Sequence, residues 1–240
     1  YAVGDIHGRL DLFATLIAGI EADDGARPRA ETTIILLGDL VDRGPDSAGA
    51  LAAARALAGR RAVRVLMGNH EEMFLDSFED ADIMRQFLRF GGRETILSYP
   101  GVELAAYREM TVEETQALMH AVVPEADIAF MRGFEEHIAM GDYLFVHAGV
   151  RPNLPLSDQK AREMRWIREP FLSHPEDHGL VVVHGHTIFE APDIRHNRIG
   201  IDTGAWTSGR LTALGLEGTA RWLIEAEEGD GAIRTAQRSI

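Results

Sequence analysis

Five short segments of the sequence carry side chains that can bind metals or phosphates, and each segment follows an apolar run. In chain order, they are Gly4-Asp5-Ile6-His7-Gly8, Gly38-Asp39-Leu40-Val41-Asp42-Arg43-Gly44, Gly68-Asn69-His70-Glu71, Val146-His147-Ala148-Gly149 and His184-Gly185-His186-Thr187. Because ligands of α/β proteins bind beyond the carboxyl ends of the strands, we expect these segments to converge. Their glycines let the backbone turn sharply and approach an ion or a phosphate closely.

The residue types in these segments suit a centre of two metal ions. Asp5 and His7 lie two residues apart, so both side chains can reach one ion from an extended loop. A carboxylate such as Asp39 can bridge two ions about 3.5–4 Å apart, the separation used in in-line phosphoryl displacement. Two dications that share a water would lower its pKa and give hydroxide near neutral pH. The expected ligands are Asp5, His7, Asp39, Asn69, His147 and His186.

Cysteine is absent from the chain, and this narrows the chemistry. A disulfide scaffold, a zinc–thiolate site and a cysteine nucleophile are all excluded. Oxygen and nitrogen ligands suit Mn²⁺, Fe or Zn²⁺ better than softer metals. We therefore expect two divalent ions as cofactors, with Mn²⁺ favoured and Fe or Zn²⁺ as alternatives.

The elements that position these segments alternate between buried strands and helices. Apolar runs predict strands at residues 2–3, 33–37, 63–67, 138–140, 143–146, 180–183, 196–201, 212–216 and 220–224. Helices are predicted at 10–20, 46–57 and 71–78. This alternation indicates strands that are buried on both faces, and the closely spaced late strands favour hairpins. We expect an α/β fold, a two-sheet α/β sandwich with a mixed strand order, and we expect the acidic run at 225–230 to be a solvated end.

Residues 83–130 contain few strand signals and are predicted to be helical. The sequence Thr111-Val112-Glu113-Glu114 is a capping-box pattern that opens a helix, and Pro124 ends that helix. The pair Gly91-Gly92 predicts a helix break. We expect a single domain over residues 1–240, with a small helical insertion at about 83–130 that covers the site.

Three of the segments occur in a fixed order, about 30 residues apart. Gly-Asp-Ile-His-Gly, Gly-Asp-Leu-Val-Asp-Arg-Gly and Gly-Asn-His-Glu, followed by the two histidine motifs, resemble the calcineurin-like metallophosphoesterases. More narrowly, they resemble the phosphoprotein phosphatase family of Ser/Thr protein phosphatases in its compact bacterial and phage form. The motifs run from Gly4 to Thr187, so the resemblance covers most of the chain.

The resemblance implies a role for each matching residue. The first ion would be held by Asp5, His7 and Asp39, and the second by Asp39, Asn69, His147 and His186. His70 would be the general acid that protonates the leaving oxygen, and Asp42 would orient it and raise its pKa. Arg43 would grip the phosphate with its planar guanidinium. The substrate-binding residues implied are Arg43, Arg168, Asn69 and His70.

A second phosphate-binding arginine is expected in Met164-Arg165-Trp166-Ile167-Arg168-Glu169. We favour Arg168, because it follows the tryptophan as in bacterial relatives, and Arg165 is the alternative. Many calcineurin-like nucleases carry Gly-His-X-His, whereas Ile188 stands at the last position here, which favours the phosphatase branch. His184 matches no ligand position and is expected to have a structural role.

The leading functional prediction is a metal-dependent phosphomonoester hydrolase, a Ser/Thr protein phosphatase, in which metal-bound hydroxide attacks phosphorus directly. One alternative is symmetrical diadenosine tetraphosphate hydrolysis, which uses the same core. Asp42 and Glu71 favour the phosphatase, because dinucleotide hydrolases usually carry Ala and Asp at these positions, whereas Pro45 is shared with them. A third possibility, a catalytically silent metal-binding scaffold, conflicts with the intact set of ligands, acid and arginine.

Composition limits the partners of the chain. The net charge of −14 disfavours nucleic acid and anionic membranes, since no dense Lys/Arg block is present. No apolar run approaches the ~20 residues of a membrane span. We expect a cytoplasmic protein whose partner is a phosphorylated protein or a small phosphoester, without nucleic acid or membrane, and the sequence predicts no oligomeric state.

Overall fold

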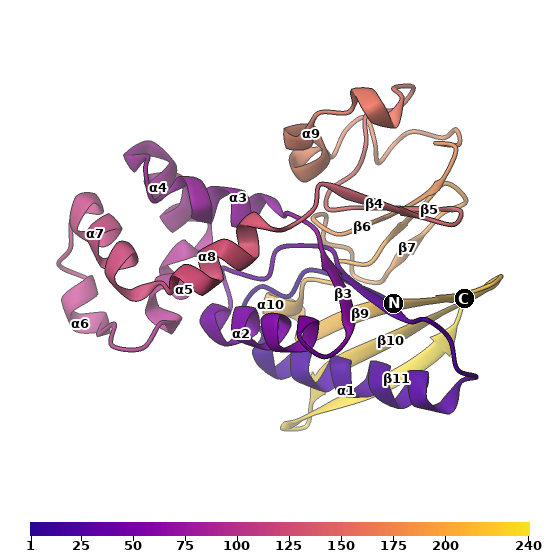
Figure 1. Ribbon diagram of the computed structural model, residues 1–240, viewed down its shortest axis with the longest axis horizontal. Helices are drawn as coiled ribbons and strands as arrows, with labels where there is room; N and C mark the ends of the chain where they lie inside the picture. The colour runs from indigo at the N-terminus through magenta and orange to yellow at the C-terminus, as the bar shows by residue number, and fades with distance from the viewer.

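The computed structural model describes residues 1–240, and its strands form two mixed sheets (Figure 1). The six-stranded sheet has the order β11-β10-β9-β1-β2-β3, and the five-stranded sheet has the order β4-β5-β6-β8-β7. The strands of the first sheet are β1 (Ala2–Val3), β2 (Thr33–Leu36), β3 (Ala62–Val65), β9 (Arg210–Glu217), β10 (Ala220–Gly229) and β11 (Ala232–Ser239). Those of the second are β4 (His137–Met140), β5 (Tyr143–Val146), β6 (Val181–His184), β7 (Asp193–Ile194) and β8 (Arg198–Gly200). The predicted two-sheet α/β sandwich is confirmed.

Apolar side chains from both sheets form one buried cluster between them. Ile35 and Leu214 from the first sheet belong to the same cluster as Phe145, Val183 and Ile199 from the second. β1, β2 and β3 are parallel, with Ala2 opposite Ile35, and β5, β6 and β8 are also parallel. The carboxyl ends of parallel strands meet at one edge of a sheet, so the loops that follow them are brought together.

Helices α1 (Leu10–Ala26) and α2 (Ser47–Ala58) cover the outer face of the first sheet (Figure 1). Phe13 and Leu16 of α1 and Leu51 of α2 belong to one core with Ile224 of β10. The amino end of α2 is capped by Asp46, whose Oδ1 accepts a hydrogen bond from the Gly49 amide at 2.8 Å. Both helices therefore bury an apolar stripe against the sheet that carries the first three segments.

Every element from Ala81 to Arg132 is helical, and these helices stand to one side of the sandwich (Figure 1). In chain order after β3, the helices are α3 (Asn69–Asp76), α4 (Ala81–Phe87), η1 (Leu88–Gly92), α5 (Arg93–Ser98), α6 (Leu104–Tyr107), α7 (Val112–Val122) and α8 (Glu125–Arg132). The capping box at Thr111 and Glu114 is present, and the helical path breaks at Gly91, whose φ is 110°. That residues 1–240 form one domain stays a prediction.

Two strands, β7 and β11, were not predicted, and the prediction of a solvated end at residues 225–230 was wrong. The acidic run at 225–230 is not a free end, because Glu225 to Gly229 belong to β10 and pair with β11, with Glu225 opposite Ala236. Ile224 and Ala226 are buried while the alternate glutamates face outward, so the run has the period of a half-buried strand.

The remaining helices are η2 (Leu156–Asp158), α9 (Ala161–Trp166) and α10 (Ala205–Ser208). None of the helices is both long and apolar enough to span a bilayer.

Candidate metal centre and substrate cleft

The six predicted ligands come together at the carboxyl ends of strands from both sheets. Their loops follow β1, β2, β3, β5 and β6. All six side chains are buried: Asp5, His7, Asp39, Asn69, His147 and His186. Five of the seven non-glycine residues with positive φ lie in this cluster or beside it, namely His7, Asp39, Asp42, Arg43 and His186. Backbone strain of this kind concentrates at functional sites.

Asp39 lies at the centre of the cluster. Its Oδ2 is 3.6 Å from His7 Nε2 and 3.4 Å from His147 Nε2. Two groups of potential ligand atoms share this residue: one combines it with His7 and His70, and the other with His147 and His186. Within each group the atoms lie within 4.8 Å of one another, and this carboxylate therefore has the position required to bridge two ions.

Hydrogen bonds fix the orientation of the other potential ligands. Asn69 Oδ1 lies 3.0 Å from His147 Nε2 and 2.8 Å from His186 Nδ1. The opposite ring nitrogen of His147 contacts the Leu37 carbonyl at 2.7 Å, and His7 Nδ1 contacts the Val41 carbonyl at 2.8 Å. Such backbone contacts hold one nitrogen of each ring and direct the other toward the centre, as is usual for histidines that bind metals.

The donor atoms of this cluster fit divalent cations. Asp5 Oδ1 and His186 Nε2 are buried and have no hydrogen-bond partner, although Asp5 Oδ2 accepts from the His186 amide at 2.9 Å. Buried polar atoms are normally satisfied, so a lone carboxylate oxygen and a lone imidazole nitrogen in an Asp/His cluster are what a cation would use. His184 Nε2 is also unpartnered, but His184 belongs to neither group of potential ligands, in agreement with a structural role.

The close packing of these groups shifts their pKa values in opposite directions. Burial and the nearby Asp202 raise the pKa of Asp5 well above its usual value. Burial opposes ionisation of Asp39 too, yet His147 and His70 hold its pKa well below the usual range. Although burial lowers it, the pKa of His147 is raised to about 10 by Asp39. The site concentrates negative charge that a bound cation would stabilise.

His70 lies beside the centre in contact with Asp42 and Arg43. Its Nδ1 is 2.6 Å from Asp42 Oδ2, and its Nε2 is 2.9 Å from Arg43 Nη2. Asp42 is fully buried and also accepts a hydrogen bond from Thr95 Oγ1 at 2.6 Å. Burial lowers the pKa of His70, but Asp39 and Asp42 outweigh it and raise that pKa. Because a guanidinium can only donate, His70 Nε2 is the acceptor in its contact with Arg43.

A cleft of about 710 Å³ opens beside this cluster. It is lined by Arg43, Arg89, Phe90, Gly91, Glu94, Arg168, His186, Thr187, Ile188 and Trp206. Arg168, which was favoured from the sequence, lines this cleft and forms no ion pair, whereas Arg165 is paired with Glu72 and Glu136. The structure thus brings Arg168, and not Arg165, together with Arg43.

Two buried carboxylates at the site were not among the predicted site residues. Glu71 accepts hydrogen bonds from the amides of Asp39 at 2.8 Å, Leu40 at 2.6 Å and Gly68 at 3.1 Å, so it ties two of the loops together. Asp202 accepts from the Gly204 amide at 2.9 Å, and burial raises its pKa to about 6. The sequence did carry a signal for Asp202, because this residue follows an apolar run with a glycine nearby, as the five segments do.

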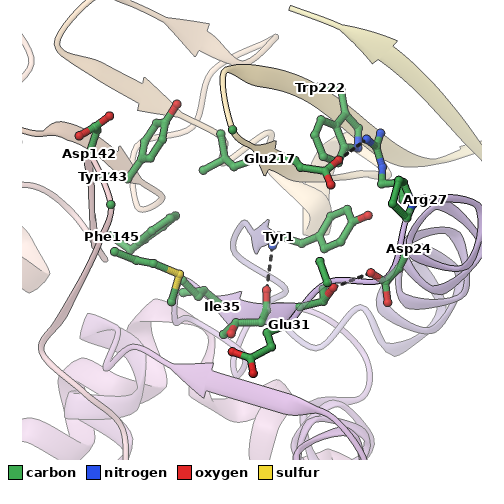
Figure 2. Close-up of a pocket in the computed structure, with 18 residues that line it drawn as sticks. Tyr1, Asp24, Arg27, Glu31, Ile35, Asp142, Tyr143, Phe145, Glu217 and Trp222 are labelled. Atoms are coloured by element: carbon green, nitrogen blue, oxygen red, sulfur yellow. Dashed lines mark hydrogen bonds and ion pairs between the residues drawn. The ribbon is translucent and has the colours of Figure 1, made fainter.

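A second cavity, of about 380 Å³, lies at the opposite ends of the parallel strands, near the starts of β2 and β5 (Figure 2). Its walls are aromatic and acidic, with Tyr1, Phe145 and Glu31 among them. The only basic side chain there is Arg27, which pairs with Glu217 and stacks on the Trp222 ring at 3.5 Å (Figure 2). This cavity offers no free cation and no histidine, whereas the cleft beside the Asp39 cluster has both.

Comparisons with known proteins agree with this geometry. Residues 1–211 match the family model described as calcineurin-like phosphoesterase. The asymmetrical bis(5'-nucleosyl)-tetraphosphatase PrpE of Bacillus velezensis is 26% identical over 237 residues, covering 88% of this chain and 86% of that protein. The symmetrical bis(5'-nucleosyl)-tetraphosphatase of Acidovorax sp. is 35% identical over 154 residues, which cover 63% of this chain and 44% of that protein.

Solved structures show the same fold. A crystal structure of a candidate diadenosine tetraphosphatase has a TM-score of 0.61 at 19% identity, covering 98% of this chain and 91% of that chain. The cold-active protein-tyrosine phosphatase of a psychrophile, Shewanella sp., has a TM-score of 0.60 at 21% identity, covering 98% and 78%. With a family model matched over most of its length and a cluster of Asp and His side chains suited to metals, the chain belongs to the calcineurin-like phosphoesterase family.

Proposed function

We propose that this chain hydrolyses dinucleoside tetraphosphates at a centre of two divalent metal ions. Symmetrical diadenosine tetraphosphate hydrolysis was the alternative to a Ser/Thr protein phosphatase in the sequence prediction. The names of the relatives support this class of substrate, since the asymmetrical PrpE proteins and the symmetrical enzymes are both bis(5'-nucleosyl)-tetraphosphatases. The ions would be held by Asp5, His7, Asp39, Asn69, His147 and His186. Mn²⁺ is the metal we propose, because the donor atoms are all oxygen and nitrogen.

The observation that carries this proposal is the chemistry of the cleft beside Asp39. Three arginines line it, Arg43, Arg89 and Arg168, although the chain as a whole has a net charge of −14. Exposed aromatic side chains, Phe90 and Trp206, line the same cleft. A chain of several phosphates with bases at its ends matches both features, since cations neutralise the phosphates and aromatic rings accept bases.

The protein side chains have separate tasks in this reaction. Divalent ions, when bound, would act as Lewis acids toward the phosphoryl oxygens and lower the pKa of a water molecule. Arg43 and Arg168 would bind the phosphoryl group and neutralise charge that develops on its oxygens. His70 would give a proton to the leaving phosphate oxygen, and Asp42, at 2.6 Å from His70 Nδ1, would hold the ring in place.

A second candidate is hydrolysis of phosphomonoesters, with phosphoserine or phosphothreonine proteins as substrates. The short contact between Asp42 and His70 favours it. A well-supported general acid matters most when the leaving group is a strongly basic alkoxide, and it matters less when a polyphosphate leaves. The two candidates therefore share one metal centre and differ in what occupies the cleft.

A parallel assay of the Mn²⁺-loaded protein separates these candidates. Diadenosine tetraphosphate, p-nitrophenyl phosphate and a phosphoserine peptide would be compared by kcat/KM, with chromatography to identify the nucleotide products. We expect the dinucleotide to be the best of the three substrates. A higher kcat/KM on the phosphoserine peptide would overturn the proposal in favour of the phosphatase, and metal binding without any hydrolysis would support a scaffold.

A further inference from the structure

Two aromatic side chains in the cleft are partly exposed. Phe90 is 45% exposed and Trp206 is 41% exposed. Trp222, by contrast, is almost fully buried at 4% exposed. Surface left open beside a polar centre points to contact with something other than the chain itself.

The two rings come from two distant segments that form walls of the cleft. Phe90 belongs to η1 in the helical region, whereas Trp206 belongs to α10 after β8. Arg43 links the two walls: its amide donates to the Gly91 carbonyl at 3.1 Å, and its guanidinium lies 5.4 Å from the Trp206 ring. The arginine that reaches His7 and His70 therefore contacts the Trp206 ring and the residue that follows Phe90.

The charges between these walls favour an anionic ligand. Arg89 and Arg168 form no ion pair, and Glu94, the acid of the cleft lining, is paired with Arg93. Most other arginines near acids are paired, for example Arg9 with Asp11 and Glu228. Two unpaired cations in a strongly acidic chain would attract a ligand with several negative charges.

We propose that Trp206 and Phe90 are specificity-determining residues that stack against the bases of the nucleotide substrate, while Arg89 and Arg168 contact its phosphate chain. This inference rests on the proposed function. Every base has a π face, so the two rings would accept purines and pyrimidines alike, and stacking would set affinity more than turnover. A phosphoserine peptide would leave both rings without a partner.

The kinetic test uses the full, Mn²⁺-loaded chain with the changes Trp206→Ala, Trp206→Phe and Phe90→Ala. We expect either alanine change to raise KM for diadenosine tetraphosphate roughly tenfold, as loss of one base–aromatic stack predicts, with little change in kcat. The inhibition constant of inorganic tripolyphosphate, which has no base, should stay as in the unchanged protein. Trp206→Phe should retain most of the affinity. Leu104→Ala, which removes another exposed apolar side chain at 44%, is the matched control.

A spectroscopic readout tests the contact directly. Titration with ATP should quench tryptophan fluorescence of the unchanged chain, and Trp206→Phe should remove that response while Trp166 and Trp222 remain. Inorganic tripolyphosphate should cause no quenching. Equal quenching in Trp206→Phe and in the unchanged chain would refute the stacking role. In the kinetic test, the same would follow if Trp206→Ala raised the KM for the dinucleotide and the inhibition constant of tripolyphosphate by the same factor.

Failure of this inference and failure of the proposed function give different results. If the unchanged chain hydrolyses diadenosine tetraphosphate and the alanine variants keep its KM, the stacking role is wrong and the proposed function stands. If the unchanged chain hydrolyses the phosphoserine peptide and not the dinucleotide, the proposed function is wrong and the stacking role falls with it.

Discussion

His70 and Asp42 are joined by a contact of 2.6 Å in a fully buried environment. This pair bears on which substrate the chain hydrolyses best, because leaving groups differ in their need for a proton. A buried carboxylate beside an imidazole fixes which ring nitrogen holds the proton and favours the charged ring. Nε2 is then the ring nitrogen that would give a proton to the substrate, and in the structure it contacts Arg43 Nη2 at 2.9 Å. The effect of removing this donor depends on how strongly the leaving group needs a proton.

His70→Asn should therefore reduce turnover to different degrees on different substrates. We expect kcat to fall by about 10²–10⁴-fold on a phosphoserine peptide, the usual range for loss of a general acid, and by less on diadenosine tetraphosphate. Steady-state kinetics of the Mn²⁺-loaded variant on both substrates would measure this difference. His120→Asn, a change in α7, serves as the control. Undiminished activity of His70→Asn on both substrates would show that His70 is not the acid.

The convergence of the six proposed metal ligands could be predicted from the sequence because each is a chemically distinctive residue directly after an apolar run. Asp202 escaped notice because its Asp-Thr-Gly, taken alone, resembles an ordinary turn. The choice between Arg165 and Arg168 also needed the structure. Their placement depends on Glu72 and Glu136, which come from distant parts of the chain and pair with Arg165.

At the scale of elements, the loop after β6 packs directly against the loop after β1. A Cβ added to Gly185 would lie 2.0 Å from Asp5 Oδ1, which is far inside van der Waals contact. The carboxylate cannot retreat freely, because its other oxygen accepts from the His186 amide at 2.9 Å. Only glycine allows these two loops to approach so closely.

Gly185→Ala should displace Asp5 and weaken metal binding with little change in the fold. We expect a loss of kcat/KM of at least about tenfold, since displacement of a ligand or its supporting partner typically weakens metal affinity 10–100-fold. Metal analysis after dialysis would report the stoichiometry. Gly25→Ala in α1, where nothing lies within 4 Å of the new Cβ, should keep activity and stabilise the chain by about 0.5–1 kcal/mol. Full metal content and activity in Gly185→Ala would contradict this account.

The amino end of α7 offers a test that concerns stability alone. Thr111 Oγ1 accepts from the Glu114 amide at 3.2 Å, and the Glu114 carboxylate accepts from the Thr111 amide at 2.7 Å. Thr111→Ala removes half of this capping box and should lower the free energy of unfolding by about 0.5–2 kcal/mol. Urea unfolding would measure the loss, and phosphohydrolase activity at low temperature should not change. A variant as stable as the unchanged chain would show that α7 does not depend on its cap.

The strands that lead into the site could be predicted, whereas the edge strands β7 and β11 could not. Residues 33–37 and 143–146 are continuous apolar runs, as strands buried on both faces require. β11 has mostly exposed and polar side chains, so its sequence carries no strand period, and its place depends on backbone pairing with β10. β7 has two residues, too few for any pattern.

Across the whole molecule, the six potential ligands are divided between loops of both sheets, so bound ions would hold the two sheets together at one edge. A ligand that binds only the folded chain stabilises it by about 2.7 kcal/mol at a free concentration of one hundred times its Kd. For a chain of this length, such a gain corresponds to a rise in Tm of roughly 5–10 °C.

Removal of metal with EDTA should accordingly lower Tm by several degrees, and added Mn²⁺ should restore it. Differential scanning calorimetry of the stripped and reloaded chain would measure the shift. Asp39→Asn should show little or no shift, because the bridging carboxylate is lost, whereas Asp142→Asn, an exposed change at the opposite end of β5, should respond like the unchanged chain. Equal Tm values with and without Mn²⁺ would indicate that the ions do not connect the two sheets.

The position of β1 between β2 and β9 also constrains how the protein is made. Ala2 and Val3 pair with Leu214 and Ala213 on one side and with Ile35 and Leu36 on the other. During synthesis on the ribosome, the first strand can meet β2 early, but its other edge stays open until more than two hundred further residues have emerged. The six-stranded sheet, which carries the Asp5 loop, is therefore completed only after β9, β10 and β11 have emerged.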